Sequence, residues 1–257
     1  MVRGLYTAYT GMSNEQKRLD IIANNLANAA TTGYKKESVT NQSFDNVLAI
    51  KIRDESEAYN DRPIGQMTLG VKLGEAYTNY GQGSLRQTNN TYDLAIEGKG
   101  FFNIQYTDRA GNTSIRYTRD GSFTMTNDGY IVDKEGNHLM GEAGEIMIPS
   151  DSMDVTIDST GNIFADGIYI DRLLISDFDN YDYLSKTGDT MYELLDGAVE
   201  VPSDGIIRQG FIEQSNVNVV SEMIEMITIT RAYEANQKVL QSMDSTLDLA
   251  ANSVGKV

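Results

Sequence analysis

The sequence predicts an α+β protein in which paired N- and C-terminal coiled-coil-like helices accompany a central antiparallel β domain. Three observations indicate this class. Apolar residues recur every seven positions at both ends, short β-prone runs alternate with turn residues in the middle, and negative charge is concentrated between the ends. The composition, with 40% hydrophobic and 23% charged residues, is ordinary for a folded chain of 257 residues.

The charge distribution separates the ends of the chain from its middle. The net charge is −16, whereas residues 1–36 and 219–257 together carry +1, so residues 37–218 carry −17. Nearly neutral ends beside an acidic middle are expected where the ends pack against other surfaces. The acidity argues against a nucleic-acid partner and an anionic membrane surface. No apolar run is long enough for direct membrane insertion.

The first helix is expected in the proline-free stretch of residues 5–28. Its seven-residue apolar stripe consists of Leu5, Met12, Leu19 and Leu26. We expect this helix to stop before Gly33, because glycine readily takes the left-handed conformation that follows a helix C-terminus. An isolated stripe of this kind is more typical of a helix packed on the core of its own domain.

A second stripe near the C-terminus favours pairing instead. It consists of Val219, Met226, Tyr233, Leu240, Leu247 and Val254. Asn218 precedes it and is the expected N-cap, since its side-chain oxygen can accept from free N–H groups in the first turn. Two helices with narrow seven-residue seams are natural coiled-coil partners, so the chain is predicted to leave one domain and re-enter it.

Between the helices the pattern is that of antiparallel strands. Short runs rich in Ile, Val, Tyr and Phe are separated by glycine-containing turns such as Asp120-Gly121, Glu135-Gly136 and Thr160-Gly161. We find no sequence repeat of fixed period, which argues against a solenoid or propeller.

These patterns predict three parts. Residues 1–34 and 218–257 are expected to form a discontinuous terminal-helix assembly domain, and residues 91–217 a central β domain. Residues 35–90 are expected to form an extended connector, because this stretch is polar, lacks periodicity and includes an acidic run from Asp54 to Asp61. The connector is predicted to become ordered beside neighbouring subunits.

The sequence lacks the residue types that most catalytic and metal sites require. Cysteine is absent, and the single histidine, His138, is expected at a solvent-facing strand position. Asp177, Asp179 and Asp182 have part of a calcium-loop spacing, but Asp182 and Gly188 stand where that loop needs Gly and Glu. We therefore expect no catalytic, metal-binding or cofactor-binding residue, no cofactor and no enzyme.

Two Gly-x-Gly pairs, at Gly81 and Gly83 and at Gly98 and Gly100, do not complete a dinucleotide-binding fingerprint. Each lies among β signals. We interpret them as turns or as places where two backbones approach closely.

Several motifs distributed over the whole chain belong together. The N-terminal ones are Leu5-Tyr6-Thr7-Ala8, Ala23-Asn24-Asn25-Leu26-Ala27-Asn28 and Thr32-Gly33-Tyr34-Lys35. The central and C-terminal ones are Asp93-Leu94-Ala95-Ile96-Glu97-Gly98, Tyr117-Thr118-Arg119-Asp120-Gly121-Ser122-Phe123, Gln209-Gly210-Phe211-Ile212-Glu213 and Arg231-Ala232-Tyr233-Glu234-Ala235-Asn236. Together they resemble the flagellar axial proteins, which build the rod and hook of the bacterial flagellum. The C-terminal motifs look more like those of a rod subunit.

The resemblance implies a structural subunit of the flagellar basal-body rod that polymerises helically into the axial drive shaft and transmits motor torque to the hook. The implied partners are copies of itself, other rod and hook proteins, and the flagellar type III export apparatus. The implied location is the basal body in the cell envelope. The first residues contain no uninterrupted apolar segment, so export without a cleaved signal peptide is expected.

The candidate site is a set of assembly residues on the two terminal helices. They are Leu5, Met12, Leu19, Asn24, Asn25, Leu26, Asn28, Met226, Tyr233, Leu240 and Leu247. The three asparagine amides are expected to bond across to neighbouring helices and set the register, with helix-end capping as the alternative. Polar Gln16 and Gln237 make the seams imperfect, so we expect the helices to pair chiefly inside the assembled rod.

Two other functions remain open at this stage. Within the same family, the chain could be a hook or hook-associated subunit. From another class, it could be a secreted β-rich binding module or a wall hydrolase, since paired carboxylates suffice for glycoside hydrolysis.

Overall fold

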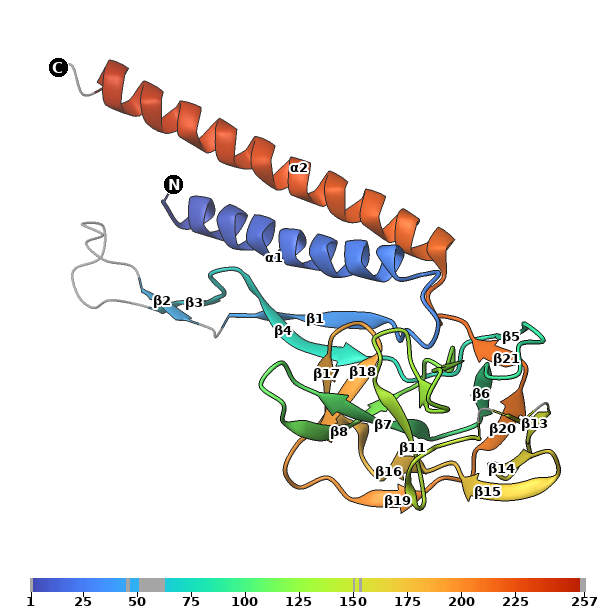
Figure 1. Cartoon of the computed structure of the whole chain (residues 1–257). Helices are drawn as coiled ribbons and strands as arrows, with labels where there is room; N and C mark the ends of the chain where they lie inside the picture. The colour runs from blue at the N-terminus through green and yellow to red at the C-terminus, as the bar shows by residue number, and fades with distance from the viewer. Residues whose placement is uncertain (1, 45–46, 51–62, 150, 153, 255–257) are drawn as a thin grey trace. The chain divides into compact units, whose positions relative to one another are not determined.

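A helix at each end of the chain and an antiparallel β region between them make up the fold (Figure 1). The structure is a computed structural model that describes residues 2–44, 47–50, 63–149, 151–152 and 154–254. Helix α1 spans Val2–Ala27, helix α2 spans Val219–Leu249, and one π-helical turn, η2, follows at Ala250–Val254. The predicted α+β class is confirmed.

The chain divides into two compact units. The helical unit comprises Met1–Leu26, Glu37–Thr78 and Val219–Val257, and the β unit comprises Ala27–Lys36 and Asn79–Asn218. The strands of the helical unit are β1 (Glu37–Ser43), β2 (Val47–Ile50), β3 (Pro63–Met67) and β4 (Val71–Thr78).

The strands of the β unit are short and follow one another closely. They are β5 (Leu85–Gln87), β6 (Leu94–Glu97), β7 (Phe101–Thr107), β8 (Thr113–Thr118), β9 (Thr124–Met125), β10 (Ile131–Val132), β11 (His138–Gly141), β12 (Gly144–Glu145), β13 (Val155–Ile157), β14 (Asn162–Ala165), β15 (Ile168–Arg172), β16 (Ile175–Phe178), β17 (Leu184–Thr187), β18 (Met191–Leu194), β19 (Glu200–Pro202), β20 (Ile206–Gln209) and β21 (Phe211–Glu213). A 3₁₀ turn, η1 (Tyr181–Tyr183), precedes β17.

Helix α1 ends where the sequence predicts. Thr31 N–H donates to the Asn28 carbonyl, and Gly33 has a φ of 68°. A Cβ added to Gly33 would lie 2.2 Å from the backbone nitrogen of Asp120. Glycine is therefore needed at position 33 both for the left-handed backbone and for the close approach of another chain segment.

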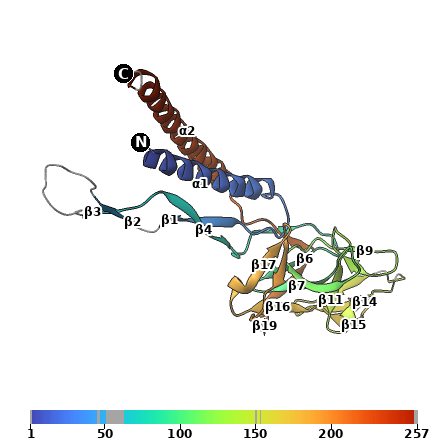
Figure 2. The same ribbon diagram turned by 90° about the vertical axis from the view of Figure 1, so that its left-hand side faces the viewer.

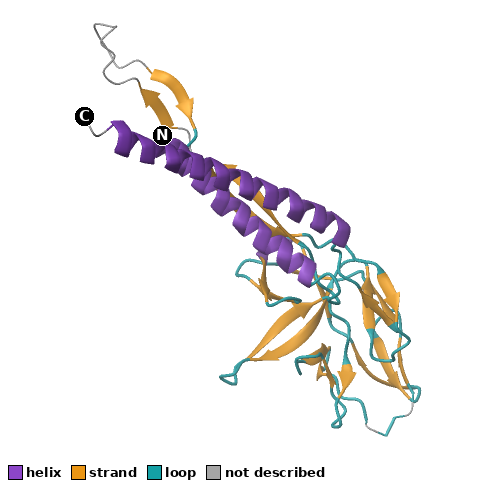
Figure 3. Cartoon of the chain, turned by 90° about the horizontal axis from the view of Figure 1, so that it is seen from above, coloured by secondary structure: helices purple, strands orange, loops and turns teal. Residues whose placement is uncertain are grey.

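Helices α1 and α2 lie side by side and antiparallel within the helical unit (Figure 3). A Cβ at Gly4 would lie 2.5 Å from the end of the Met243 side chain, and one at Gly11 would lie 3.1 Å from the Asn236 amide. These two residues have no side chain, which lets the opposite helix approach.

Further along the same line the contacts become polar. Arg18 pairs with Glu225 at 3.2 Å, and the Asn25 amide donates to the Glu222 carboxylate at 3.3 Å. In three of these pairs, Gly4 with Met243, Gly11 with Asn236 and Asn25 with Glu222, the residue numbers add up to 247. The two helices thus keep one register over seven-residue steps.

Residues expected to be an extended connector contain paired strands. Strand β1 pairs with β4 from Glu37 opposite Thr78 to Ser43 opposite Val71, with an irregularity between Val39 and Asn41. Strands β2 and β3 continue in the same direction (Figure 2). The acidic run from Asp54 to Asp61 lies outside the described residues.

Strand β7 organises the large sheet of the β unit. The sheet order is β17-β18-β8-β7-β11-β10-β9, and β16 also pairs with β7. Every strand pair among the described residues is antiparallel. The predicted β-prone runs at residues 101–106 and 114–119 correspond to β7 and β8.

Two buried clusters hold the β unit together. The larger is mostly aliphatic and is formed by Leu94, Ile96, Phe102, Ile104, Phe123, Ile131, Leu139, Ile146, Ile148, Val155, Ile157, Ile163, Ala165, Leu173, Met191 and Ile207. The smaller is mostly aromatic, with Phe101, Tyr117, Phe178, Leu184 and Tyr192. Because successive strand residues point to opposite faces, Phe101 and Phe102 of β7 enter different clusters.

Three hairpin turns have the same sequence pattern, Asp-x-x-Gly-Asn, and the same bonding. They begin at Asp108, Asp133 and Asp158, each 25 residues after the previous one. In each, the Asp N–H donates to the Asn carbonyl and the Gly N–H donates to the Asp carbonyl. Their glycines have φ values of 86°, 90° and 90°. We expected no sequence repeat of fixed period, and that expectation missed this recurring turn.

Replacing Gly33 tests how tightly the segment after α1 is held. Gly33→Ala should lower the free energy of unfolding by clearly more than Gly136→Ala. At Gly136 an added Cβ meets nothing within 4 Å, so that substitution introduces only backbone strain, which costs about 1 kcal/mol of stability. Urea unfolding followed by far-ultraviolet circular dichroism measures the difference. Equal midpoints for the two variants would contradict the close approach at Gly33.

Candidate functional site

A buried group of three charges lies where both chain ends enter the β unit. The Lys35 ammonium donates to Glu213 Oε1 at 2.5 Å, and the Arg119 guanidinium donates to Glu213 Oε2 at 3.2 Å. Their side chains are 1%, 4% and 1% exposed for Lys35, Arg119 and Glu213. Lys35 follows α1 in the chain, Glu213 ends β21 before α2, and Arg119 follows β8, so three distant segments meet here.

Backbone groups complete the coordination of these charges. The Gly83 N–H donates to Glu213 Oε1 at 2.7 Å, Lys35 donates to the Gly81 carbonyl at 3.0 Å, and Arg119 donates to the Gly98 carbonyl at 2.8 Å. A Cβ on Gly83 would lie 1.9 Å from the Gln214 carbonyl oxygen. For Gly83, the expected close approach of two backbones is confirmed.

Burial lowers the pKa of Lys35 from its ordinary value, and the charge and hydrogen bond of Glu213 oppose that effect. Leaving one of these charges without its partner in the interior is strongly unfavourable. The arrangement is therefore stable only as a complete set.

Neighbouring bonds join the same segments. The Gly33 N–H donates to the Glu213 carbonyl at 2.9 Å, and the Thr32 hydroxyl donates to the Asp120 carboxylate at 2.6 Å. The Lys36 N–H donates to the Asn216 side chain at 2.7 Å. Three of the motifs that carry the family resemblance, at residues 32–35, 117–123 and 209–213, thus contact one another.

Asn25 makes the corresponding junction inside the helical unit. It is fully buried on α1, and its amide bonds both the N–H and the carbonyl of Glu37 in β1, at 3.0 Å and 2.8 Å. The same amide reaches the buried Glu222 of α2. One side chain therefore links α1, β1 and α2.

The other expected asparagines differ in environment. Asn24 is exposed, and Asn28 is half-buried. The Asn28 side chain accepts from the Thr31 hydroxyl at 3.0 Å and lies 3.4 Å from Asp189. Asn28 therefore takes part in the helix-end contacts that the capping alternative describes.

The expected apolar seam residues are half-buried in the single chain. They are Leu5, Met12, Leu19 and Leu26 of α1, and Met226, Tyr233, Leu240 and Leu247 of α2. On α1 the observed contacts with α2 lie one residue earlier at each step, at Gly4, Gly11, Arg18 and Asn25. The sequence pattern identified the spacing, but not the glycine and polar residues that make these contacts.

Sequence reasoning did not single out Lys35, Arg119 or Glu213. A charged residue in a loop is usually solvated, and nothing nearby in the sequence indicates its partner. The available signal was their position inside motifs: Lys35 closes Thr-Gly-Tyr-Lys, and Glu213 closes Gln-Gly-Phe-Ile-Glu.

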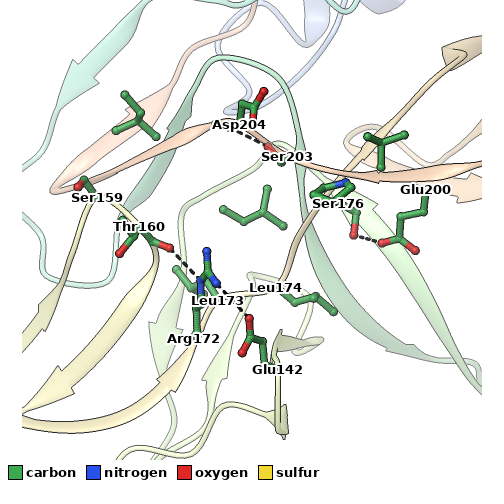
Figure 4. Close-up of a pocket in the computed structure, with 15 residues that line it drawn as sticks. Glu142, Ser159, Thr160, Arg172, Leu173, Leu174, Ser176, Glu200, Ser203 and Asp204 are labelled. Atoms are coloured by element: carbon green, nitrogen blue, oxygen red, sulfur yellow. Dashed lines mark hydrogen bonds and ion pairs between the residues drawn. The ribbon is translucent and has the colours of Figure 1, made fainter.

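A cavity of about 670 Å³ in the β unit is lined by polar and apolar residues (Figure 4). Arg172 donates to the Thr160 carbonyl at 3.2 Å and pairs with Glu142 at 3.4 Å. Ser176 of β16 donates to Glu200 of the adjacent strand β19. These polar groups mainly satisfy one another, and the lining holds no imidazole that would activate a serine nucleophile.

The remaining candidate chemical groups take part in local contacts. His138 is half-buried in β11, stacks edge-on against Tyr130 and lies 3.7 Å from Glu145. Asp177 accepts from the Tyr181 hydroxyl, and burial together with this bond raises the pKa of Tyr181. Among the described residues, three or more potential metal ligands do not cluster anywhere, and neither helix is apolar enough over sufficient length to span a membrane.

The charge cluster predicts an unequal response to removing a carboxylate. Glu213→Gln leaves two buried cations without their counterion and should lower the free energy of unfolding by about 3–5 kcal/mol. The matched control is Glu97→Gln, which breaks the half-exposed pair with Arg208 and should cost less than about 1 kcal/mol. Calorimetric or urea unfolding of the three proteins measures both. Similar losses in the two variants would contradict the role assigned to burial.

Three protein-family models match the chain and cover both ends and the middle. Residues 5–35 match the flagella basal body rod protein, residues 95–165 match the flagellar hook protein FlgE/F/G D1 domain, and residues 208–253 match the flagellar basal body rod FlgEFG protein C-terminal region. The first and third contain Lys35 and Glu213, and the second contains Arg119.

Full-length relatives agree with these matches. The chain is 35% identical to the flagellar basal-body rod protein FlgG of Bacillus subtilis (strain 168), over 98% of this chain and 99% of the relative. It is 33% identical to FlgG of Borreliella burgdorferi over 98% of each chain. It is also 34% identical to the rod protein FlgF of Caulobacter vibrioides, over 97% of this chain and 96% of the relative. The chain therefore belongs to the flagellar basal-body rod protein family and is a structural subunit of the flagellar rod.

Proposed function

We propose that this subunit acts without enzymatic chemistry, by polymerising helically through coiled-coil-like pairing of α1 and α2 inside the assembled rod. The observation that carries the proposal is the antiparallel contact line between the two helices, which keeps one register over seven-residue steps. Such spacing is what keeps one face of a helix against a partner along its length.

Apolar surface left uncovered on α2 supports assembly with further copies. Val220, Ile224 and Ile227 are 66%, 60% and 54% exposed, and their spacing of four and three residues places them on one face of α2. A continuous apolar stripe on a soluble helix is typical of a surface that is covered in the functional state. Copies that repeat one head-to-tail contact form an open helical array.

Membership of the rod family also supports a proposal about partners and location. We propose that the chain contacts copies of itself and other rod and hook proteins, and that the flagellar type III export apparatus delivers it to the basal body. In this proposal residues 1–34 and 218–257 form the inner assembly domain, residues 91–217 contact adjacent subunits further out, and residues 35–90 connect them. The resulting shaft passes motor torque to the hook.

The expected assembly residues keep their roles in this proposal. Leu5, Leu19, Leu240 and Leu247 supply apolar contacts between helices, with Met12, Leu26, Met226 and Tyr233 extending the same stripes. Asn25 sets the register of α1 against α2, as its bond to Glu222 supports. Asn24 and Asn28 are proposed to bond to helices of adjacent subunits.

A hook subunit is the nearest alternative, because the family model that matches residues 95–165 is named after a flagellar hook protein. The relatives that align over nearly the whole chain carry rod names. We therefore place the subunit in the rod.

Charges introduced into the expected seams should prevent assembly. Leu19→Asp combined with Leu240→Asp would place carboxylates at apolar helix contacts, so cells carrying only this version should not swim. The matched control is Gln16→Asp with Gln241→Asp, at two exposed positions on the same helices. The β unit of both variants should retain its strand signal in circular dichroism. Swimming cells with the double leucine change would count against the proposal.

The isolated monomer should be cut by trypsin mainly within its helices. The contact line of glycine and polar residues buries little apolar area, so α1 and α2 open easily without neighbours. Cleavage is expected after Lys17, Arg231 and Lys238, whereas the buried Arg119 should be protected. Mass spectrometry of the fragments identifies the sites. Resistance of both helices in a demonstrated monomer would contradict this expectation.

A further inference from the structure

The end of α2 extends past the start of α1. With the common register of the two helices, Val2 at the first described turn of α1 lies opposite Ser245 of α2. Helix α2 continues to Leu249, and the π-helical turn η2 follows. The residues after Ser245 therefore have no described α1 residue opposite them in their own chain.

This overhang combines one exposed apolar side chain with exposed carboxylates. Leu249 is 64% exposed, and Asp244 and Asp248 are both exposed. The two aspartates are four residues apart, which places them on one face of α2, and Leu249 lies about 100° further round the helix from Asp248. An apolar residue next to two acids is a small, specific feature for a partner surface to recognise.

The helical unit contains a groove of complementary character between α1 and β4. Its volume is about 180 Å³, and its lining residues are Tyr9, Thr10, Ser13, Asn14, Lys17, Phe44, Val71, Lys72 and Leu73. The Asn14 amide donates to Asn41 at 3.1 Å, and Gly70 packs against Thr10, so the strand ribbon is held against α1. The groove is a built feature of the unit.

The charge of the groove is opposite to that of the chain. Lys17 and Lys72 line it and no acidic side chain does, although the chain as a whole carries −16. Both lysines are exposed and make no ion pair with any residue that the structure describes. Tyr9 and Phe44 are also partly exposed, at 56% and 37%. The groove thus combines exposed aromatic surface with two cations that have no ion-pair partner among the described residues.

We infer that the overhanging end of α2 from a second copy of this chain occupies the groove between α1 and β4. Leu249 of the second copy covers the exposed aromatic surface of the groove, and its Asp244 and Asp248 pair with Lys17 and Lys72. This inference rests on the proposed self-assembly and names the two surfaces through which one contact between copies is made.

The occupant cannot come from the same chain. In the observed register Lys17 lies opposite Thr230, and Leu249 is 19 residues further along α2. At 1.5 Å per residue this is about 28 Å away along the helix. A single copy therefore leaves its own groove open, and the contact is complete only between copies.

Cysteine cross-linking tests the contact, because the chain has no cysteine of its own. The variant Ser13→Cys with Leu249→Cys should form disulfide-linked multimers in oxidised basal bodies from cells that make it in place of the unmodified chain. Within one chain the two positions are about 22 Å apart along the helix axis, beyond disulfide reach, so each bond joins two copies. The matched control is Ala23→Cys with Leu249→Cys, since Ala23 is exposed on α1 outside the groove and should leave monomers.

The charges are tested by exchange in the cross-linking variant. Lys72→Glu or Asp248→Lys alone should lower the multimer yield about two- to fivefold, and the two together should restore it. Unchanged yields in the single variants, or no restoration in the combined variant, would overturn the pairing.

The outcomes distinguish this contact from the proposed function. Swimming under reducing conditions shows that the cysteine variant assembles. If it swims and oxidation yields only monomers, or if the Ala23 control forms the same multimers, the inference is wrong and the rod assembly proposal stands. If the unmodified chain is absent from isolated basal bodies, both the inferred contact and the rod assembly proposal are wrong.

Discussion

The join between the two chain ends depends on the Glu213 carboxylate. It lies between Lys35 and Arg119, almost completely out of water, and each charge is acceptable there only because the others are present. Lys35 follows α1 in the chain and Glu213 precedes α2. The segments that carry both helices are therefore placed together or not at all.

A charged cluster at this point sets positions more strictly than an apolar one would. Apolar side chains of similar volume can repack with small shifts, whereas hydrogen bonds to the Gly81 carbonyl and the Gly83 N–H require fixed distances. For a structural subunit of the rod, a join that resists sliding suits mechanical load. The charged cluster also gives a physical reason for the Thr-Gly-Tyr-Lys and Gln-Gly-Phe-Ile-Glu motifs, which end in Lys35 and Glu213.

The two helices show the opposite balance. Glycine at positions 4 and 11 and polar groups at Arg18 and Asn25 let α1 and α2 approach in one register, but they bury little apolar surface. Several large apolar side chains of α2, such as Ile224, stay exposed, although Ile229 is buried. Register is thus defined within one chain, while apolar side chains such as Ile224 stay exposed on α2 in that single chain.

The sequence by itself determined the α+β class, the extent of both helices and the turns of the β unit. These are local properties: the seven-residue stripes, the stop at Gly33 and the glycine turns each act within a few residues. Tertiary structure alone decided the pairing of β1 with β4: no side chain of either strand is buried, and β1 is polar throughout apart from Val39. It also decided the cluster of Lys35, Arg119 and Glu213, because no local pattern shows which charges will meet when the residues lie 84 and 94 positions apart.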